Sequence, residues 1–256
     1  MNRLRVLLFA LGMSLLVAGL YHGFYYYQAQ QALCRTNSPA HAYQQWMVFH
    51  YGDKKYSQHN EELIIRDFFD DQINGVFVDV GSSHFRTNST TYYLEKNLNW
   101  RGVAIDAIKT FEDGYLENRP NTKFFSFYVS DESDRQVDFY INLHNDRLSS
   151  GLKSLAEKQG KFREQMTYSI TLNDLLNQLK IDRIDFLSMD IELAEPAALA
   201  GFDINRYRPD LVCVEAHPEV RDEILKYFQQ NNYKVIEKYR ELDPLNFYFT
   251  PVQVNR

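Results

Sequence analysis

Three short apolar segments, each carrying an acidic residue at or near its end, constrain the fold of this chain most. They span residues 75–81, 102–106 and 184–190, and their acids are Asp79, Asp106 and Asp190. A nearly continuous apolar run of this length is typical of a parallel strand that is buried on both faces. Helical patterns separate the runs, and this alternation predicts an α/β fold with a mostly parallel sheet and helices on both faces.

The same alternation continues to the end of the chain. We expect seven strands in the sheet, the other four at 122–129, 211–215, 233–237 and 247–250, and an extra hairpin strand at 137–141. Helices are expected at 90–97, 172–179 and 223–229, and after Pro196, which suits a first helical turn. Thr171 and Asp174 have the spacing of a capping box at the start of the second of these helices.

The first thirty residues form a separate segment. Arg3 and Arg5 precede an apolar run at 6–20, and a cluster of tyrosines follows it. This pattern predicts a single-pass N-terminal membrane anchor at 1–30, with a cleaved secretory signal peptide or a buried helix as alternatives. The positive-inside rule then places the N-terminus in the cytoplasm and the domain across the membrane. A polar connector at 31–60 and one domain at 61–256 complete the expected organisation.

Charge and cysteine content exclude two classes of protein. The 28 Lys and Arg against 34 Asp and Glu give a net charge of −6 without any basic block, so nucleic acid is not an expected partner. The two cysteines, Cys34 and Cys213, are far apart and belong to no Cys-x-x-Cys motif. A disulfide scaffold and a structural zinc site are therefore both excluded, and Cys213 is expected in the core.

The acids at the strand ends predict where a ligand binds. Parallel strands bring their carboxyl ends to one edge of the sheet, where ligands of open α/β sheets bind. Asp106 follows Gly81 by 25 positions, and a carboxylate so placed can accept hydrogen bonds from both ribose hydroxyls. A single acid at such a position is more often a helix cap or a solvated loop residue. Three on neighbouring strand ends favour a nucleoside-type site.

Two ordered blocks of sequence resemble the FkbM-type methyltransferases. The first combines Val78-Asp79-Val80-Gly81 and Asn88-Ser89 with the segment 92–106, and the second runs from 184 to 202. The resemblance covers roughly residues 60 to 250. It implies a Rossmann-like fold with an antiparallel last strand and S-adenosyl-L-methionine as the cofactor. It also implies O-methylation of a hydroxyl group on a glycan, a lipid-linked molecule or a secondary metabolite.

The resemblance also implies roles for individual residues. Asp79 and Gly81, with Ser82 beside them, would line the methionine end of the cofactor, and Asp106 would hold the ribose. Ser130 and Asp131 would lie near the adenine, and Asp190 and Glu192 would meet cofactor and acceptor.

His217 follows the expected strand at 211–215 and belongs to the same edge of the sheet. A loop or helix-capping role is an equally good interpretation of this histidine. Asp190, Glu192 and His217 are the candidate catalytic residues, either as general base or as holders of a divalent ion. No residue is assigned as a metal ligand.

Two positions depart from the family pattern. Phe85 stands where the first loop usually has its second glycine, and Leu193 stands where the second block usually has a glycine. A side chain at Phe85 is expected to narrow the site or re-route the loop. A catalytically degenerate, membrane-tethered binding module is therefore the alternative function. A dehydrogenase is the weakest alternative, because the chain has no G-x-G-x-x-G motif.

Overall fold

The computed structural model describes residues 38–252, and the chain from residue 47 onward forms one compact unit. No helix in the described part of the chain is both long and apolar enough to cross a membrane. The predicted anchor at 1–30 lies outside the described residues.

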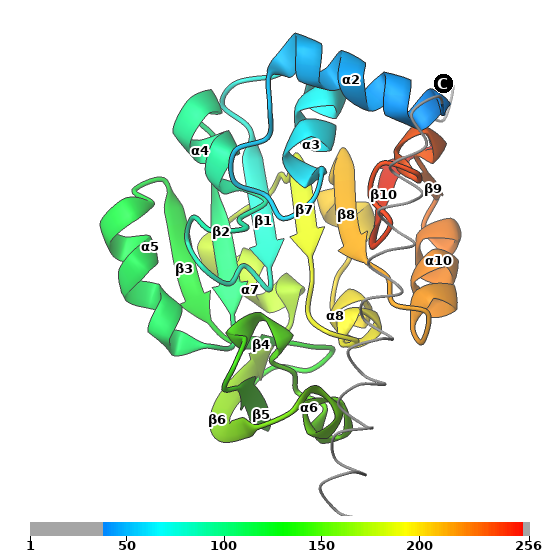
Figure 1. The fold of residues 1–256 in the computed structure, drawn as a ribbon. Helices are drawn as coiled ribbons and strands as arrows, with labels where there is room; N and C mark the ends of the chain where they lie inside the picture. Colours follow the sequence, from blue (N-terminus) through cyan, green and yellow to red (C-terminus); the bar gives the residue numbers. More distant parts are fainter. Residues whose placement is uncertain (1–37, 253–256) are drawn as a thin grey trace, which may run out of the picture. The chain divides into compact units, whose positions relative to one another are not determined.

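A seven-stranded sheet forms the centre of the unit (Figure 1). Its strand order is β3-β2-β1-β7-β8-β10-β9, in which the first five strands are parallel and β10 is antiparallel to both neighbours. The strands are β1 Val76–Val80, β2 Arg101–Asp106, β3 Thr122–Ser126, β7 Phe186–Met189, β8 Leu211–Glu215, β9 Tyr233–Val235 and β10 Asn246–Pro251. The mostly parallel sheet and the antiparallel last strand are as predicted.

Alternate residues of β1 face two different helical layers. Val78 and Val80 belong to the main core cluster, to which α7, α8 and α10 contribute their apolar faces. Asp79 points to the opposite face and meets Thr91, which precedes α4. The helices are α2 Pro39–Tyr51, α3 Glu61–Phe69, α4 Tyr92–Leu98, α5 Glu112–Asn118, α6 Lys153–Gln159, α7 Leu172–Leu179, α8 Glu195–Ala200, α9 Ile204–Tyr207 and α10 Arg221–Gln230.

Local sequence signals explain how several elements begin. The Thr171 side chain accepts a hydrogen bond from the backbone N–H of Asp174 and so caps α7, as the capping-box spacing predicted. Pro196 lies in the first turn of α8, where its missing N–H leaves no hydrogen bond unmade. Cys213 is buried in the middle of β8, as expected of a core cysteine.

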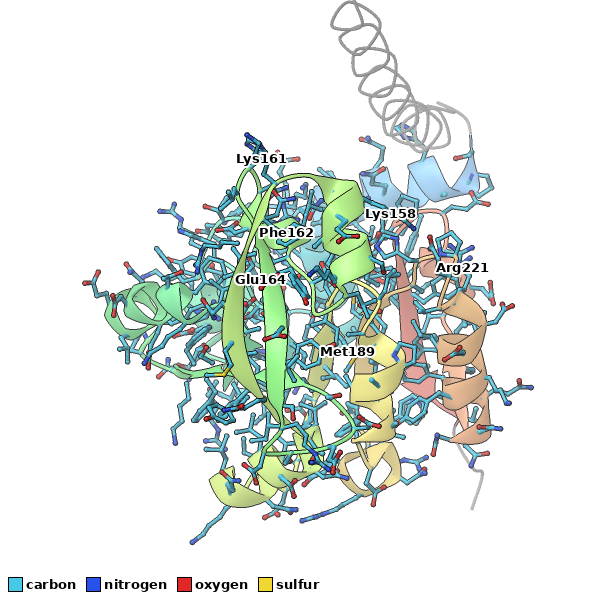
Figure 2. All side chains as sticks on the ribbon, turned by 90° about the horizontal axis from the view of Figure 1, so that it is seen from below. Lys158, Lys161, Phe162, Glu164, Met189 and Arg221 are labelled. Atoms are coloured by element: carbon cyan, nitrogen blue, oxygen red, sulfur yellow. The ribbon has the colours of Figure 1, made fainter. Side chains whose placement is uncertain are left out.

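A second, three-stranded sheet of order β4-β6-β5 lies at the carboxyl end of the parallel strands. Its strands are β4 Tyr128–Val129, β5 Gln136–Asn142 and β6 Phe162–Ile170. Figure 2 looks onto this end of the molecule and shows β6 and α6 in front of the end of β7. The hairpin strand expected at 137–141 is present as β5.

Two details of this second sheet differ from the prediction. The strand expected at 122–129 is divided, because β3 ends at Ser126 and residues 128–129 pair with β6 instead. The strand β6 was not expected, because most of its first six residues are polar or charged and only its last few are buried. Its partner β5 supplies the apolar alternation that the sequence shows.

Candidate active site

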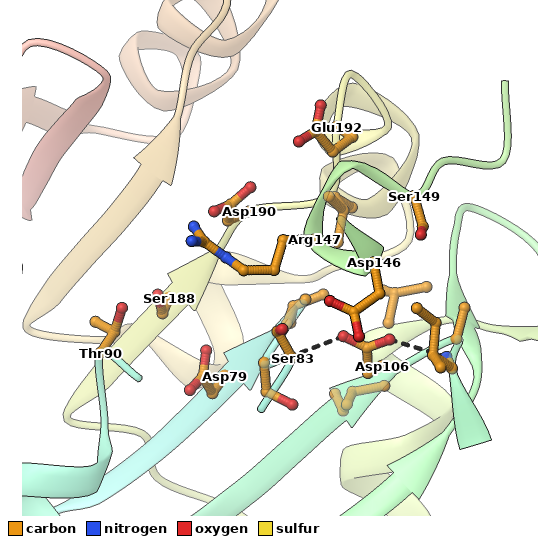
Figure 3. Close-up of a pocket in the computed structure, with 18 of the residues that line it drawn as sticks. Asp79, Ser83, Thr90, Asp106, Asp146, Arg147, Ser149, Ser188, Asp190 and Glu192 are labelled. Atoms are coloured by element: carbon orange, nitrogen blue, oxygen red, sulfur yellow. Dashed lines mark hydrogen bonds between the residues drawn. The ribbon is translucent and has the colours of Figure 1, made fainter. Parts of the chain in front are cut away.

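A cleft opens at the carboxyl ends of the parallel strands and contains all three strand-end acids (Figure 3). Asp106 is the last residue of β2, Asp79 is the last but one of β1, and Asp190 follows β7; these three strands are neighbours in the sheet. The prediction that these acids share one edge is therefore confirmed. The sheet order also sets their sequence along the cleft, with Asp79 between the other two.

The turn after β1 brings the backbone of Gly81 against the chain that follows β7. Gly81 has a φ of +79°, and a Cβ added there would lie 1.8 Å from the carbonyl oxygen of Asp190. The backbone N–H groups of Gly81 and Ser82 both donate to the carbonyl oxygen of Ile105, at 2.9 and 3.1 Å. Only glycine meets both the conformation and the close approach.

Asp106 fixes the loops on both sides of it. Its carboxylate accepts hydrogen bonds from the backbone N–H groups of Ser83, at 2.9 Å, and Ile108, at 2.8 Å. A carboxylate can accept about four hydrogen bonds, so it retains acceptor capacity for a pair of hydroxyl groups. Burial raises the pKa of Asp106 to about 6, and the group is therefore ionised at neutral pH.

Asp79 forms the floor of the cleft and is held from below. It is 4% exposed, and its carboxylate accepts a hydrogen bond from Thr91 Oγ1 at 2.7 Å. Thr91 in turn accepts from Arg119 Nη2 at 3.2 Å, and the Arg119 guanidinium pairs with Glu95. Burial raises the pKa of Asp79 to about 6, although the bond from Thr91 and the charge of Arg119 oppose this shift.

A cluster of acidic groups closes the other end of the cleft. Asp190 and Glu192 line it, and Glu192, Glu215 and His217 each place a possible ligand atom within 4.8 Å of the others. His217 Nε2 lies 3.0 Å from Glu215 Oε2. Burial and the negative charge of Asp190 raise the pKa of Glu192 to about 7.

The protonated carboxyl group of Glu215 donates a hydrogen bond to the carboxylate of Asp190. Burial, and then the negative charges of Asp190 and Glu192, raise the pKa of Glu215 well above its ordinary range. The protein atoms packed around Asp190 raise the pKa of this group as well, although its side chain is exposed to the cleft.

The structure gathers most of the predicted site residues, but not all of them. Asp79, Gly81, Ser82, Asp106, Asp190 and Glu192 line the cleft, and His217 lies beside it in the acidic cluster. Ser130 and Asp131 do not line the cleft. Asp131 is exposed and accepts a hydrogen bond from Ser130 Oγ. The apolar lining near Asp106 comes instead from Ile108, Phe127 and Val129.

Three further residues contribute to the site and were not predicted from the sequence. Glu215 ends β8 just as the three recognised acids end their strands, so the same signal could have identified it. Arg147 reaches toward Asp190 from the loop after β5 (Figure 3), and no motif marks that loop. Glu61, in the first turn of α3, lines the cleft although it is only 6% exposed. Burial, and then the charge of Asp243, raise the pKa of Glu61 to about 8.

The two departures from the family pattern have different outcomes. Phe85 does not line the cleft, because its ring packs over Gly114 of α5, where an added Cβ would lie 2.6 Å from it. The expected narrowing of the site by Phe85 is therefore wrong. Leu193 does adopt a backbone conformation that suits glycine, with a φ of +75° after a φ of +54° at Glu192. The loop keeps this path with a leucine, at a cost of about 1–2 kcal/mol.

The cleft fits S-adenosylmethionine by the chemistry of its lining. The Ser82 and Ser83 hydroxyls are buried there and have no hydrogen-bond partner in the described part of the chain. Gly81 leaves backbone exposed where a side chain would otherwise stand. Acidic groups suit the positively charged sulfonium and amino groups of this cofactor, and Asp106 suits its ribose.

Comparison with known proteins supports this interpretation. A family model described as "Methyltransferase FkbM domain" matches residues 78–235. A search of curated proteins gives no match.

Several solved structures are similar at low identity. A TehB-like SAM-dependent methyltransferase from Corynebacterium glutamicum is 14% identical, with 84% of this chain and 100% of that chain covered and a TM-score of 0.44. A putative RNA methyltransferase from Pyrococcus horikoshii is 14% identical, covering 75% of this chain and 82% of that one, with a TM-score of 0.38. A precorrin-6y C5,15-methyltransferase from Geobacter metallireducens is 13% identical, covering 72% and 76%, with a TM-score of 0.40.

The family model covers more than half of the chain and includes the three strand-end acids. The protein therefore belongs to the FkbM family of methyltransferases, whose cofactor is S-adenosylmethionine.

Proposed function

We propose that this protein transfers the methyl group of S-adenosylmethionine to a hydroxyl oxygen of a glycan, a lipid-linked molecule or a secondary metabolite. The observation that carries the proposal is the order of acids along the cleft, with Asp106 and Asp79 at one end and Asp190 with Glu192 at the other. The first pair suits the cofactor, and the second pair is left for the acceptor. When bound, the cofactor supplies an electrophilic methyl group.

The protein positions the cofactor and the acceptor and takes up the proton of the acceptor hydroxyl. Asp106 and the turn at Gly81 hold the cofactor side, and the loop that carries Arg147 covers the acceptor side (Figure 3). Holding two reactants in line supplies much of the rate of such a displacement. The acceptor hydroxyl must also lose its proton, and Asp190 is the accessible carboxylate at that end of the cleft. We assign to Asp190 the role of proton acceptor.

The test follows radiolabelled methyl groups from S-adenosylmethionine into glycans, lipid extracts and polyhydroxylated metabolites, with the purified full-length protein. Mass spectrometry of the labelled product should place the methyl group on oxygen. The Asp190→Asn variant should lose most of the transfer while it still binds the cofactor. The exposed Asp138 of β5 offers the matched control, and Asp138→Asn should retain both methyl transfer and cofactor binding. Label on nitrogen or carbon, or an Asp190→Asn variant with normal transfer, would contradict the proposal.

We also propose that residues 1–30 anchor the chain in a membrane, because Arg3 and Arg5 precede the apolar run at 6–20. Fractionation of cells that produce the full chain, followed by alkaline extraction, tests this. An anchored protein stays with the membranes, whereas a chain without residues 1–30 should be released. Recovery of the full chain in the supernatant would contradict the anchor.

A further inference from the structure

The acidic cluster beside the cleft has the composition of a metal site. It combines the carboxylates of Glu192 and Glu215 with the imidazole of His217, and their ligand atoms lie within 4.8 Å of one another. Glu215 ends β8, His217 follows two residues later, and Glu192 stands in the loop after β7. Because β7 and β8 are neighbours, the sheet itself brings the three side chains together.

A buried oxygen that makes no hydrogen bond within the described residues points into this cluster. Glu215 is only 9% exposed, and its Oε2 atom accepts no hydrogen bond from the described residues. His217 Nε2 lies 3.0 Å from that oxygen, which is within ion-pair distance, but in an orientation that makes no hydrogen bond. Two ligands about 2.1 Å from one ion and at right angles are about 3 Å apart, so this spacing is that of neighbouring ligands.

Apart from His217 and the hydrogen bond between Glu215 and Asp190, the described residues offer little to balance these carboxyl groups. Within residues 38–252, neither Glu192 nor Glu215 forms an ion pair with a lysine or arginine. Arg147 approaches Asp190 instead (Figure 3). Glu192 is held in place by Gln159, whose Nε2 donates to Glu192 Oε2 at 3.4 Å, and by Ser150, whose Oγ donates to the Glu192 carbonyl oxygen at 3.2 Å. A cation at this point would satisfy both the buried oxygen and the clustered carboxylates.

We propose that Glu192, Glu215 and His217 bind one divalent first-row metal ion at the acceptor end of the cleft. Carboxylates with one imidazole suit Mn²⁺ or Zn²⁺ better than Ca²⁺, which prefers oxygen ligands alone. Glu192 also lines the cleft, so the ion would lie at its edge. Its catalytic consequence rests on the proposed function, since there it would polarise the acceptor hydroxyl and leave Asp190 to take the proton.

Metal binding is measured directly, without any assay of methyl transfer. The full-length protein, freed of metal by a chelator and dialysis, is titrated with Mn²⁺ while the electron paramagnetic resonance signal of free Mn²⁺ is recorded. Calorimetry with Zn²⁺ provides the second probe. We expect one ion per chain. Glu215→Gln and His217→Gln should each weaken binding by about 10-fold or more, because each removes a ligand.

Matched variants separate a lost ligand from a lost fold. Glu219 is exposed on the same loop as His217, and Glu219→Gln should bind the ion as the natural protein does. Glu192 is half-buried, so Glu192→Gln is less disruptive to the fold than Glu215→Gln. It removes a different proposed ligand and serves as the test if Glu215→Gln does not fold. Each variant is also titrated with S-adenosylmethionine to confirm that the cofactor side is intact.

The possible outcomes distinguish this inference from the proposed function. One bound ion that is lost in the ligand variants, with cofactor binding retained, supports the metal site. No binding of either ion at millimolar concentration, or equal binding by the Glu215→Gln and Glu219→Gln variants, overturns it and leaves the methyl transfer proposal standing. A metal site without transfer to any hydroxyl overturns the proposed function alone.

Discussion

The backbone of Gly81 contacts the carbonyl group of Asp190 so closely that no side chain fits between them. A Cβ on Gly81 would lie 1.8 Å from that oxygen, and the residue has a φ of +79°. The turn after β1, to which we assign the cofactor, is therefore built against the loop after β7, to which we assign the acceptor.

Gly81→Ala should destabilise the protein by more than about 2 kcal/mol, since it combines a disfavoured backbone conformation with a steric clash. It should also abolish binding of S-adenosylmethionine, measured by calorimetry beside thermal unfolding. Gly52 has a φ of +78° and no atom within 4 Å of its added Cβ. The control Gly52→Ala should therefore lose only about 1 kcal/mol. Equal losses in the two variants would mean that the contact with Asp190 has no effect.

Asp106→Asn should weaken cofactor binding about 10- to 100-fold, because an amide oxygen replaces a charged acceptor that also holds Ser83 and Ile108. Calorimetric titration measures the loss, and Asp138→Asn is again the control. Unchanged affinity would remove Asp106 from the binding site. The affinity of the natural protein should also fall as the pH drops below 6, because the pKa of Asp106 is about 6 and its protonated form is a weaker acceptor.

Phe85→Ala should reduce the stability of the domain by about 1–3 kcal/mol, because its half-buried ring packs on α5. Cofactor affinity should stay unchanged, because Phe85 does not line the cleft. Urea unfolding and calorimetry on the same sample measure the two effects. A loss of affinity as large as that of Asp106→Asn would return Phe85 to the site.

Glu61→Gln should stabilise the protein above neutral pH. The pKa of Glu61 is raised from 4.5 to about 8, so the folded state binds a proton that the unfolded state has released between these two values. This bound proton stabilises the folded state. Its contribution to the free energy of unfolding is fully present below pH 4.5, decreases above that value and is lost as the pH rises through 8. Glutamine does not titrate, so the Glu61→Gln variant does not lose this stability as the pH rises.

The stabilisation by Glu61→Gln at pH 8 should exceed about 1 kcal/mol, since one pKa unit corresponds to about 1.4 kcal/mol. At pH 5 the variant and the natural protein should be equal. Urea unfolding at both pH values measures the difference, with the exposed Glu241→Gln as the control. A constant difference at the two pH values would show that the titration of Glu61 has no effect on stability.

The sequence predicted the sheet well because its strands are buried on both faces. Strands such as β1 and β7 are continuous apolar runs, and their acids mark the ends that line the cleft. The strand β6 could not be predicted in this way, because its first residues are largely polar and its place depends on pairing with β5. The role of Arg147 likewise depends on the path of a loop, which no local pattern encodes.

The position of the Phe85 ring could not be predicted from the sequence for a different physical reason. The family pattern shows that Phe85 stands at a position that usually holds glycine. It does not show where the phenylalanine ring points, because that depends on the space left by a residue of another helix. Gly114 of α5 provides that gap, and it lies 29 positions further along the chain. Leu193 needed no such compensation, because the backbone accepts the left-handed conformation at a modest cost.

The small sheet leaves and rejoins the main fold at a single point. The backbone N–H of Ser130 donates to the carbonyl oxygen of Ile170 at 3.0 Å, so the segment between them begins and ends side by side. That segment carries Arg147 and Ser149 into the cleft, whereas Asp79 and Asp106 belong to the parallel sheet. A change in the length or sequence of residues 131–169 would therefore leave in place the parallel sheet that carries Asp79 and Asp106, and under the proposed function it would alter the acceptor side of the cleft alone.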